Sequence, residues 1–317
     1  MTPRFWLGVL VIVVAGAAWM LASRIESFRV TSVPSDAAMR SAARTASSDA
    51  TSRAAGLEQG LAASCRRSLD ALRRKAGANL TYKLDVPFLL AGDLSEAELN
   101  RITDQTIRPV AEALRRQYFQ ARPTEPITIL LFAGEPSYER YARKLFGDTK
   151  IPHFGYYRPG DRTLVMNLAT GTGTLVHELV HALAAFDFPK MPDWFSEGLA
   201  SLYEQCALAG GEIRGLPNWR LPDLQEALRA GTVRPLKEMM TAADFRGPLE
   251  GLNYAQGRYF CLYMQERGVL GMFYRRFRDG VAEDPTGVRF VEEVFRGEPL
   301  DRLDRDYARW VLTLRWP

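Results

Sequence analysis

The chain contains little histidine and little cysteine, three residues of each among 317. An odd number of cysteines allows at most one internal disulfide, so a small scaffold held together by disulfides is excluded. If a disulfide forms, Cys206 and Cys261 are the expected pair; the alternative is three buried thiols. The sequence also lacks a dense block of Lys and Arg with interleaved aromatic residues, and nucleic-acid binding is therefore not expected.

Long uncharged hydrophobic runs are missing except at the N-terminus, where Phe5 to Ala22 contains 18 residues between Arg4 and Arg24. This length lies at the lower limit for crossing a bilayer and exceeds the usual hydrophobic region of a signal peptide. We predict that residues 1–22 form one transmembrane helix that anchors the chain in the cell membrane, and a cleavable signal peptide is the alternative. In either case the rest of the chain is expected on the extracytoplasmic, periplasmic side.

Residues 23–56 contain almost no aromatic or large aliphatic side chains and consist mainly of Ser, Ala, Thr and Arg. Such a composition buries too little apolar surface to fold. We therefore predict a disordered tether between the membrane and the folded part, which begins at about Leu57.

Apolar periodicity from residue 57 onwards predicts an α+β protein with a small, mostly antiparallel sheet and a mainly helical C-terminal part. We expect a catalytic lobe over residues 57–205 and a helical lobe over residues 206–317. The predicted elements are a helix at 57–75, a strand at 81–92, a helix at 95–119 with a capping box and a kink at Pro109, a buried strand at 127–133, a helix at 136–147, a hairpin at 154–167 and a small hairpin at 209–215.

Two of the three histidines stand four residues apart in the segment TLVHELVHAL, residues 174–183. On a helix, His177 and His181 project from one face, and Glu178 directly follows the first histidine. A purely structural role would require this apolar helix to bury Glu178 without a partner, which is costly. The pattern therefore predicts a zinc site, and a hydrolytic zinc site needs a third protein ligand.

Two residues are candidates for that third ligand. Asp187 stands six residues after His181, the position of the third ligand in metzincin-type enzymes, but these need a glycine where this chain has Ala184. Glu197 lies near the start of the next predicted helix, after prolines at 189 and 192 that separate the two helices. The second helix can run antiparallel to the first, so that Glu197 faces the histidine pair.

A His-Glu-x-x-His helix followed by Trp-x-x-Glu-Gly-x-Ala, here residues 194–200, resembles the gluzincins and is most similar to the bacterial peptidase MA-like group. The likeness is specific over residues 156–204. It implies a zincin-like fold and a Zn²⁺ ion held by His177, His181 and Glu197. It also implies that Glu178 is the general base that takes a proton from the attacking water.

The resemblance implies further roles. Ser201 and Glu204 share a helix face with Glu197 and are candidates to hold the ligand histidines, although many gluzincins have an acid in place of Ser201. Tyr254 corresponds to the downstream tyrosine that donates to the developing oxyanion. The strand at 162–167 corresponds to the edge strand that pairs with an extended peptide.

These features predict a membrane-tethered zinc metallopeptidase that hydrolyses a peptide or protein substrate without a covalent intermediate. The alternative is a catalytically silent binding or scaffold module of the cell envelope that retains the fold. The intact Glu178 favours the enzyme, because a scaffold has no need of a general base. Hydrolysis of a non-peptide substrate is a third reading, since metal ligands alone do not define the substrate.

Overall fold

The computed structural model describes residues 36–316, and side chains from Ala55 onwards. The chain divides into two units, residues 1–55 and 56–317. Helix α1, Asp36–Ala76, includes residues 36–56, so this part of the predicted tether is helical rather than disordered. Its many Ala and Arg residues have high helix propensities, which accounts for the difference.

No helix within residues 36–316 is long and apolar enough to cross a membrane. The predicted anchor, residues 1–22, and the start of the tether lie outside the described residues.

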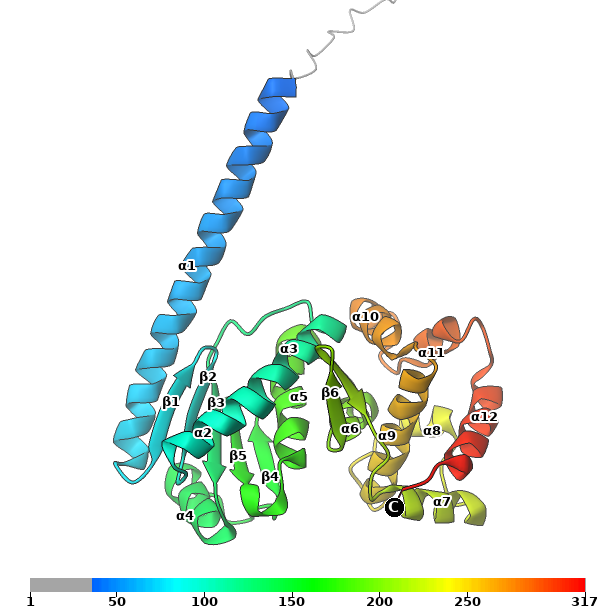
Figure 1. Ribbon diagram of the computed structural model, residues 1–317. Helices are drawn as coiled ribbons and strands as arrows, with labels where there is room; N and C mark the ends of the chain where they lie inside the picture. Colours follow the sequence, from blue (N-terminus) through cyan, green and yellow to red (C-terminus); the bar gives the residue numbers. More distant parts are fainter. Residues whose placement is uncertain (1–35, 317) are drawn as a thin grey trace, which may run out of the picture. The chain divides into compact units, whose positions relative to one another are not determined.

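A five-stranded sheet forms the centre of the second unit, in the order β1-β2-β3-β5-β4 (Figure 1). The outer pairs, β1 with β2 and β4 with β5, are antiparallel, and the inner pairs, β2 with β3 and β3 with β5, are parallel. The sheet is mixed, so the prediction of a mostly antiparallel sheet is wrong: helical crossovers bring successive strands back in the same direction. The strands are β1 Thr81–Asp85, β2 Phe88–Gly92, β3 Ile127–Phe132, β4 Gly155–Arg158 and β5 Thr163–Asn167.

The predicted strand at 81–92 is two strands, because the chain turns at Val86-Pro87 between β1 and β2. The buried strand β3 and the hairpin of β4 and β5 agree with the predictions. The predicted helix at 95–119 begins with the expected capping box of Ser95 and Glu98 and comprises α2 Glu96–Ile102, a π-helical turn Thr103–Ile107, and α3 Arg108–Gln117. The π turn ends two residues before Pro109, whose ring nitrogen carries no hydrogen to donate.

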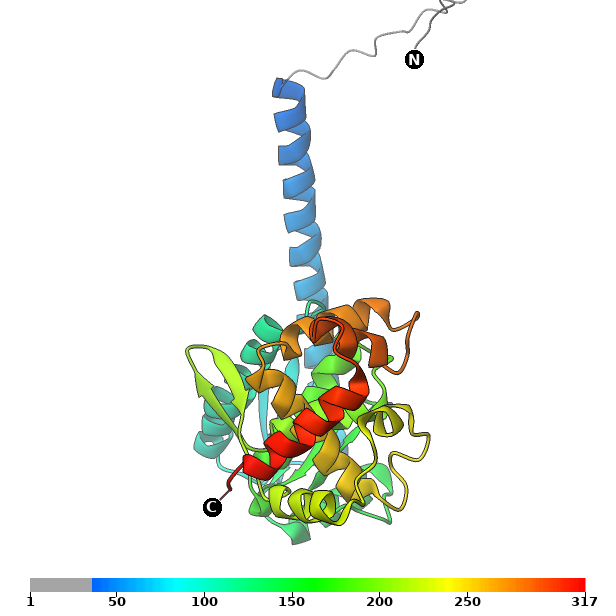
Figure 2. The same cartoon turned by 90° about the vertical axis from the view of Figure 1, so that its right-hand side faces the viewer.

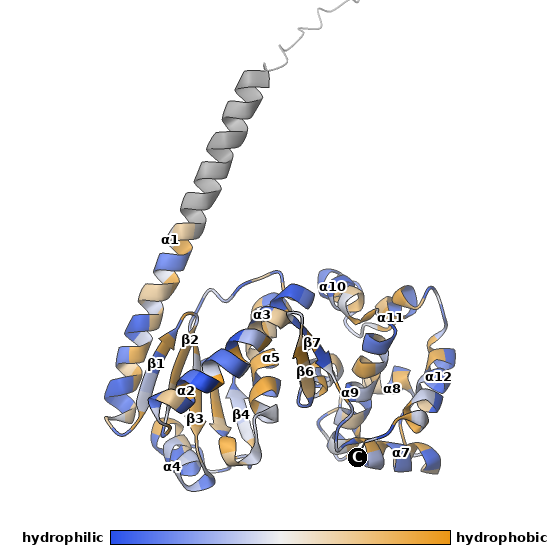
Figure 3. Cartoon of the chain, in the orientation of Figure 1, coloured by the Kyte–Doolittle hydropathy of each residue, from blue (hydrophilic) through white to orange (hydrophobic). Residues whose placement is uncertain are grey.

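Helices cover both faces of the sheet. One face packs against α3 and α5 (Gly173–Asp187), and the other against α4 (Glu135–Phe146) and the end of α1. Figure 3 shows the inner strands β2, β3 and β5 as mainly hydrophobic, as expected for strands that are buried on both sides, and the edge strands β1 and β4 as more polar. The side chains facing α3 and α5 are Leu90, Ile129, Leu131, Leu164 and Met166, and those facing α4 and α1 are Leu89, Ala91, Leu130, Phe132 and Val165.

The remainder is a small hairpin and a group of helices, as predicted, and α12 packs against α7, α8 and α9 (Figure 2). One hydrophobic core runs from the sheet through these helices and therefore includes residues of both predicted lobes, 57–205 and 206–317. The elements are α6 Asp193–Leu202, β6 Cys206–Ala209, β7 Glu212–Gly215, α7 Leu221–Ala230, α8 Leu236–Thr241, α9 Glu250–Glu266, α10 Leu270–Gly280, α11 Val288–Val294 and α12 Leu300–Thr313.

Helices α6 and α9 touch through their backbones. A Cβ atom added to Gly198 would lie 2.8 Å from the carbonyl oxygen of Gly257, and one added to Gly257 would lie 2.9 Å from the carbonyl oxygen of Trp194. Both separations are too short for any side chain larger than glycine without movement of the backbone. This close packing fixes α6, and with it Glu197, against the C-terminal helices.

Candidate metal centre

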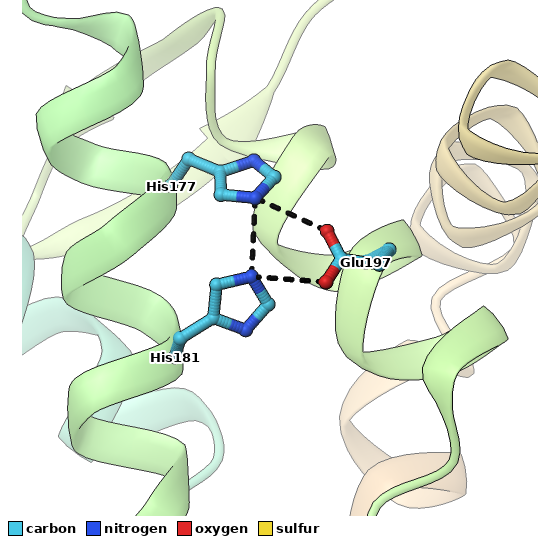
Figure 4. Close-up of side chains that lie close together, drawn as sticks. All are labelled: His177, His181 and Glu197. Carbon is cyan, nitrogen blue, oxygen red and sulfur yellow. Dashed lines mark hydrogen bonds and ion pairs between the residues drawn. The ribbon is translucent and has the colours of Figure 1, made fainter. Parts of the chain in front are cut away.

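The candidate centre lies between helices α5 and α6, which are joined by a short turn. His177 and His181 project from α5, one helical turn apart, and Glu197 projects from α6. Pro192 precedes the first residue of α6 in an extended conformation, which redirects the chain after α5. Figure 4 shows the three side chains pointing toward one another across the space between the helices.

The three side chains are close enough to share one ion. The Nε2 atoms of His177 and His181 are 3.1 Å apart, and the carboxylate oxygens of Glu197 lie 3.2 Å from the first nitrogen and 3.4 Å from the second. Glu197 is only 2% exposed and His177 only 7%. Among the described residues, the only polar neighbour of Oε2 of Glu197 is Nε2 of His177. Two imidazole nitrogens and a buried carboxylate oxygen form a group that could hold a metal ion.

The outer nitrogen of each histidine also has a partner. Nδ1 of His177 lies 3.1 Å from Oε1 of Glu204, and Nδ1 of His181 lies 3.1 Å from the hydroxyl of Ser196. Glu204 in turn accepts hydrogen bonds from the Arg220 guanidinium at 3.0 and 3.2 Å. A partner at Nδ1 orients the ring and leaves Nε2 for a metal.

Of the two residues predicted to hold the histidines, the structure places Glu204 in contact and Ser201 elsewhere. Ser201 is fully buried, and its hydroxyl makes no hydrogen bond to the described residues. The contact of Ser196 with His181 was not predicted from the sequence, because one serine beside a predicted helix start carries no distinguishing signal.

The charges of the centre compensate one another. Burial lowers the pKa of His177, but hydrogen bonds to Glu197 and Glu204 raise it by more, to about 10. Burial raises the pKa of Glu204, and its hydrogen bond to His177 and its pairing with Arg220 outweigh this and lower it to about 2. Hydrogen bonds from both histidines likewise hold the pKa of Glu197 well below its usual range against the effect of burial. Without a cation, a proton on His177 and the guanidinium of Arg220 together balance the two carboxylates.

Asp187, the alternative third ligand, does not reach this centre. Its Oδ1 accepts hydrogen bonds from the backbone N–H groups of Gln120 and Ala121, at 2.8 and 2.6 Å. Its Oδ2 accepts from the hydroxyl of Tyr274 and the guanidinium of Arg278, both at 3.0 Å. All four partners are structural, and the helix continues through Ala184 as expected in the absence of a glycine. Through these hydrogen bonds, Asp187 links the end of α5 to α10 and to the segment after α3.

The centre opens into a cavity of about 1010 Å³. Glu178 lines this cavity and is half-buried, so it is not enclosed in the core as a structural residue of the helix would be. Tyr254 also lines the cavity, and burial together with the negative charge of Glu197 raises its pKa. The predicted general base and the predicted oxyanion donor therefore border the same space as the three candidate ligands.

Arg246, which precedes α9, is a cavity residue that sequence reasoning missed. Its Nη2 donates to Oε1 of Glu197 at 2.5 Å, and its Nη1 donates to the hydroxyl of Tyr254 at 3.3 Å. It follows Glu197 by 49 residues in a segment without regular structure, and no local pattern marks it.

The strand predicted to bind peptide, residues 162–167, is not an edge. It corresponds to β5, which pairs with β3 on one side and β4 on the other, so both of its edges are occupied. The edge strand of this side of the sheet is β4, and Tyr156 and Tyr157 of β4 line the cavity. The identity of the edge strand is therefore corrected from β5 to β4.

All three cysteines are free thiols, Cys65 and Cys261 buried and Cys206 partly buried, which is the alternative to a Cys206–Cys261 disulfide. No protein-family model matches the chain, and no curated protein matches it.

Proposed function

We propose that this protein is a zinc-dependent peptidase of the gluzincin type. The observation that carries the proposal is the convergence of His177, His181 and Glu197 on one point at the wall of a cavity that Glu178 also lines. The sequence motif alone places His177, Glu178 and His181 together on one helix. The fourth, Glu197, comes from a separate helix and supplies the third ligand that a hydrolytic zinc site needs.

The residues fit a zinc ion. Two nitrogen donors and one carboxylate are a ligand set found in catalytic zinc sites, and Oε2 of Glu197, whose one polar neighbour among the described residues is Nε2 of His177, is a buried atom that a cation would satisfy. When bound, zinc supplies Lewis acidity, which polarises a substrate carbonyl and lowers the pKa of water to about 7.

Protein side chains perform the remaining steps. Glu178 accepts the proton of the attacking water and passes it to the leaving amine, so that the peptide bond breaks without a covalent intermediate. The Tyr254 hydroxyl donates a hydrogen bond to the oxygen on which negative charge develops. Its raised pKa keeps this hydroxyl protonated, as a donor requires.

The edge strand β4 is the place where we propose that the substrate peptide binds. Its outer edge has no partner strand within the described residues, and its tyrosines border the cavity. An extended peptide can add to such an edge through backbone hydrogen bonds. We further propose that residues 1–22 tether the enzyme to the membrane with this site on the extracytoplasmic side.

The test is digestion of a peptide library by the zinc-loaded full chain, compared with Glu178→Gln and Glu96→Gln. Glu96, the first residue of α2, is an exposed carboxylate that does not line the cavity and serves as the matched control. We expect Glu178→Gln to lose about 10²–10⁴-fold in activity and Glu96→Gln to retain activity within a few-fold. A zinc-loaded wild type that cleaves no peptide would favour the silent scaffold or a non-peptide substrate.

A further inference from the structure

The three candidate ligands each have an outer partner, and the partner of Glu197 is Arg246. Glu204 holds His177, Ser196 holds His181, and Nη2 of Arg246 lies 2.5 Å from Oε1 of Glu197. Arg246 is thus placed where it can fix the direction in which the carboxylate points.

Arg246 forms ion pairs with two acidic residues of α6, Asp193 and Glu197. Its Nε lies 3.3 Å from the carboxylate of Asp193, which is one helical turn before Glu197. Asp193 and Arg246 are about half exposed, whereas the Glu197 side chain is only 2% exposed. The exposed ion pair contributes little by itself, while the bond to the buried carboxylate acts in a less polar environment and is stronger.

Contacts of neighbouring residues fix the backbone segment that carries Arg246, and this segment therefore positions the guanidinium. Asp244 pairs with both Nη atoms of Arg234 at 2.7 and 2.8 Å. Phe245 is buried against the ring of Tyr254, and its carbonyl oxygen accepts a hydrogen bond from Asn253 at 2.7 Å. Positioning by preorganised groups is what a metal ligand needs from its surroundings.

From this arrangement we infer that Arg246 is the positioning residue of Glu197, an inference that rests on the proposed metal site. Arg246 occupies Oε1, so that Oε2, whose one polar neighbour among the described residues is Nε2 of His177, would be the oxygen left to bind the ion. Glu197 would then bind through one oxygen, and two histidines and one oxygen would leave a position for water or a substrate carbonyl.

Two effects of Arg246 on a bound cation oppose each other. Its positive charge repels the ion, and its hydrogen bond orients the ligand. The variant Arg246→Lys keeps the charge and removes the planar fork of donors, so it isolates the orienting effect. We expect Arg246→Lys to bind Zn²⁺ about 10–100-fold more weakly than the wild type in a chelator competition.

The matched control is Arg214→Lys. Arg214 forms a surface ion pair with Glu266, in which one Nη atom lies 2.8 Å from each carboxylate oxygen.

The second readout is the visible absorption of the full chain loaded with Co²⁺, which depends on the number and geometry of the ligand atoms. Arg246→Lys should change this spectrum and Arg214→Lys should not, with equal thermal stability of the metal-free variants as the check on folding. Unchanged affinity and spectrum in Arg246→Lys would overturn the inference and leave the metal site intact. A wild type that binds neither metal would overturn the proposed function as well.

Discussion

The variant Asp187→Asn tests whether the aspartate at the end of α5 is a structural residue or a metal ligand. The carboxylate is buried and accepts four hydrogen bonds, two at each oxygen. Asparagine has nearly the same shape, and its side-chain oxygen can still accept from the N–H groups of Gln120 and Ala121. Its amide nitrogen would then face the guanidinium of Arg278, so that two donors meet.

The magnitude follows from what this replacement breaks. One charge-assisted hydrogen bond to Arg278 is lost, worth about 1.5–3 kcal/mol. The Arg278 side chain is only 9% exposed and keeps one exposed partner, Asp279, so part of the cost of an unpaired buried charge is added. We expect the free energy of unfolding to fall by about 2–4 kcal/mol, with no change in metal content.

Thermal unfolding of the metal-free full chain measures this effect. For a folded unit of this size, about 3 °C of melting temperature corresponds to 1 kcal/mol, so the transition should fall by roughly 6–12 °C. Asp301→Asn, at an exposed position in the first turn of α12, is the control and should leave the transition in place. Loss of bound metal in a folded Asp187→Asn protein would refute the structural role.

Three further predictions concern the centre and the thiols. Glu204→Gln should weaken zinc binding about 10–100-fold in a competition assay, because His177 loses the partner that orients it; wild-type affinity would contradict this. The pKa of His177 is raised from 6.5 to about 10 in the folded metal-free protein, so its contribution to stability is complete below pH 6.5 and is lost as the pH rises to 10. In urea unfolding with a chelator present, the midpoint urea concentration should therefore fall as the pH rises from 6.5 to 10, and it should fall less in His177→Gln. A thiol reagent should modify Cys206 first and the buried Cys65 and Cys261 only on unfolding; equal rates for all three would be inconsistent with the structure.

The local part of the site could be predicted from the sequence because one helix encodes it. The spacing of His177 and His181 fixes their common face once the segment is helical, and the prolines after the helix predict the reversal that brings Glu197 back. The choice between Asp187 and Glu197 depended on whether the chain turned at Ala184. In the structure the helix continues through Ala184 and Asp187 has four protein partners, whereas Glu197 lies beside both histidines.

Residues contributed by distant segments could not be predicted. Arg220 reaches Glu204 from a loop after β7, and Arg246 reaches Glu197 from the segment before α9. Neither lies in a motif, since their roles depend on how the C-terminal helices pack against α6. The direct contact of Gly198 with Gly257 sets that packing, and a glycine in a helix does not indicate its partner.

The same reasoning applies to the sheet. Each strand was recognised from apolar runs and turn residues, but strand order depends on crossovers that the local pattern does not contain. For this reason the sequence predicts β5 as the edge strand, whereas in the structure β4 occupies the edge. Residues 36–56 were expected to be disordered for lack of apolar side chains, although a helix needs only favourable backbone propensities.

The most direct test of the central claim is the metal content of the purified full chain, measured by mass spectrometry for the wild type, His181→Ala and Glu197→Ala. We predict about one zinc per wild-type chain and a clear loss in both variants, because each removes one of only three protein ligands. Absence of zinc from a wild type purified without chelators would contradict the account. Zinc that remains fully bound in Glu197→Ala would contradict the assignment of the third ligand.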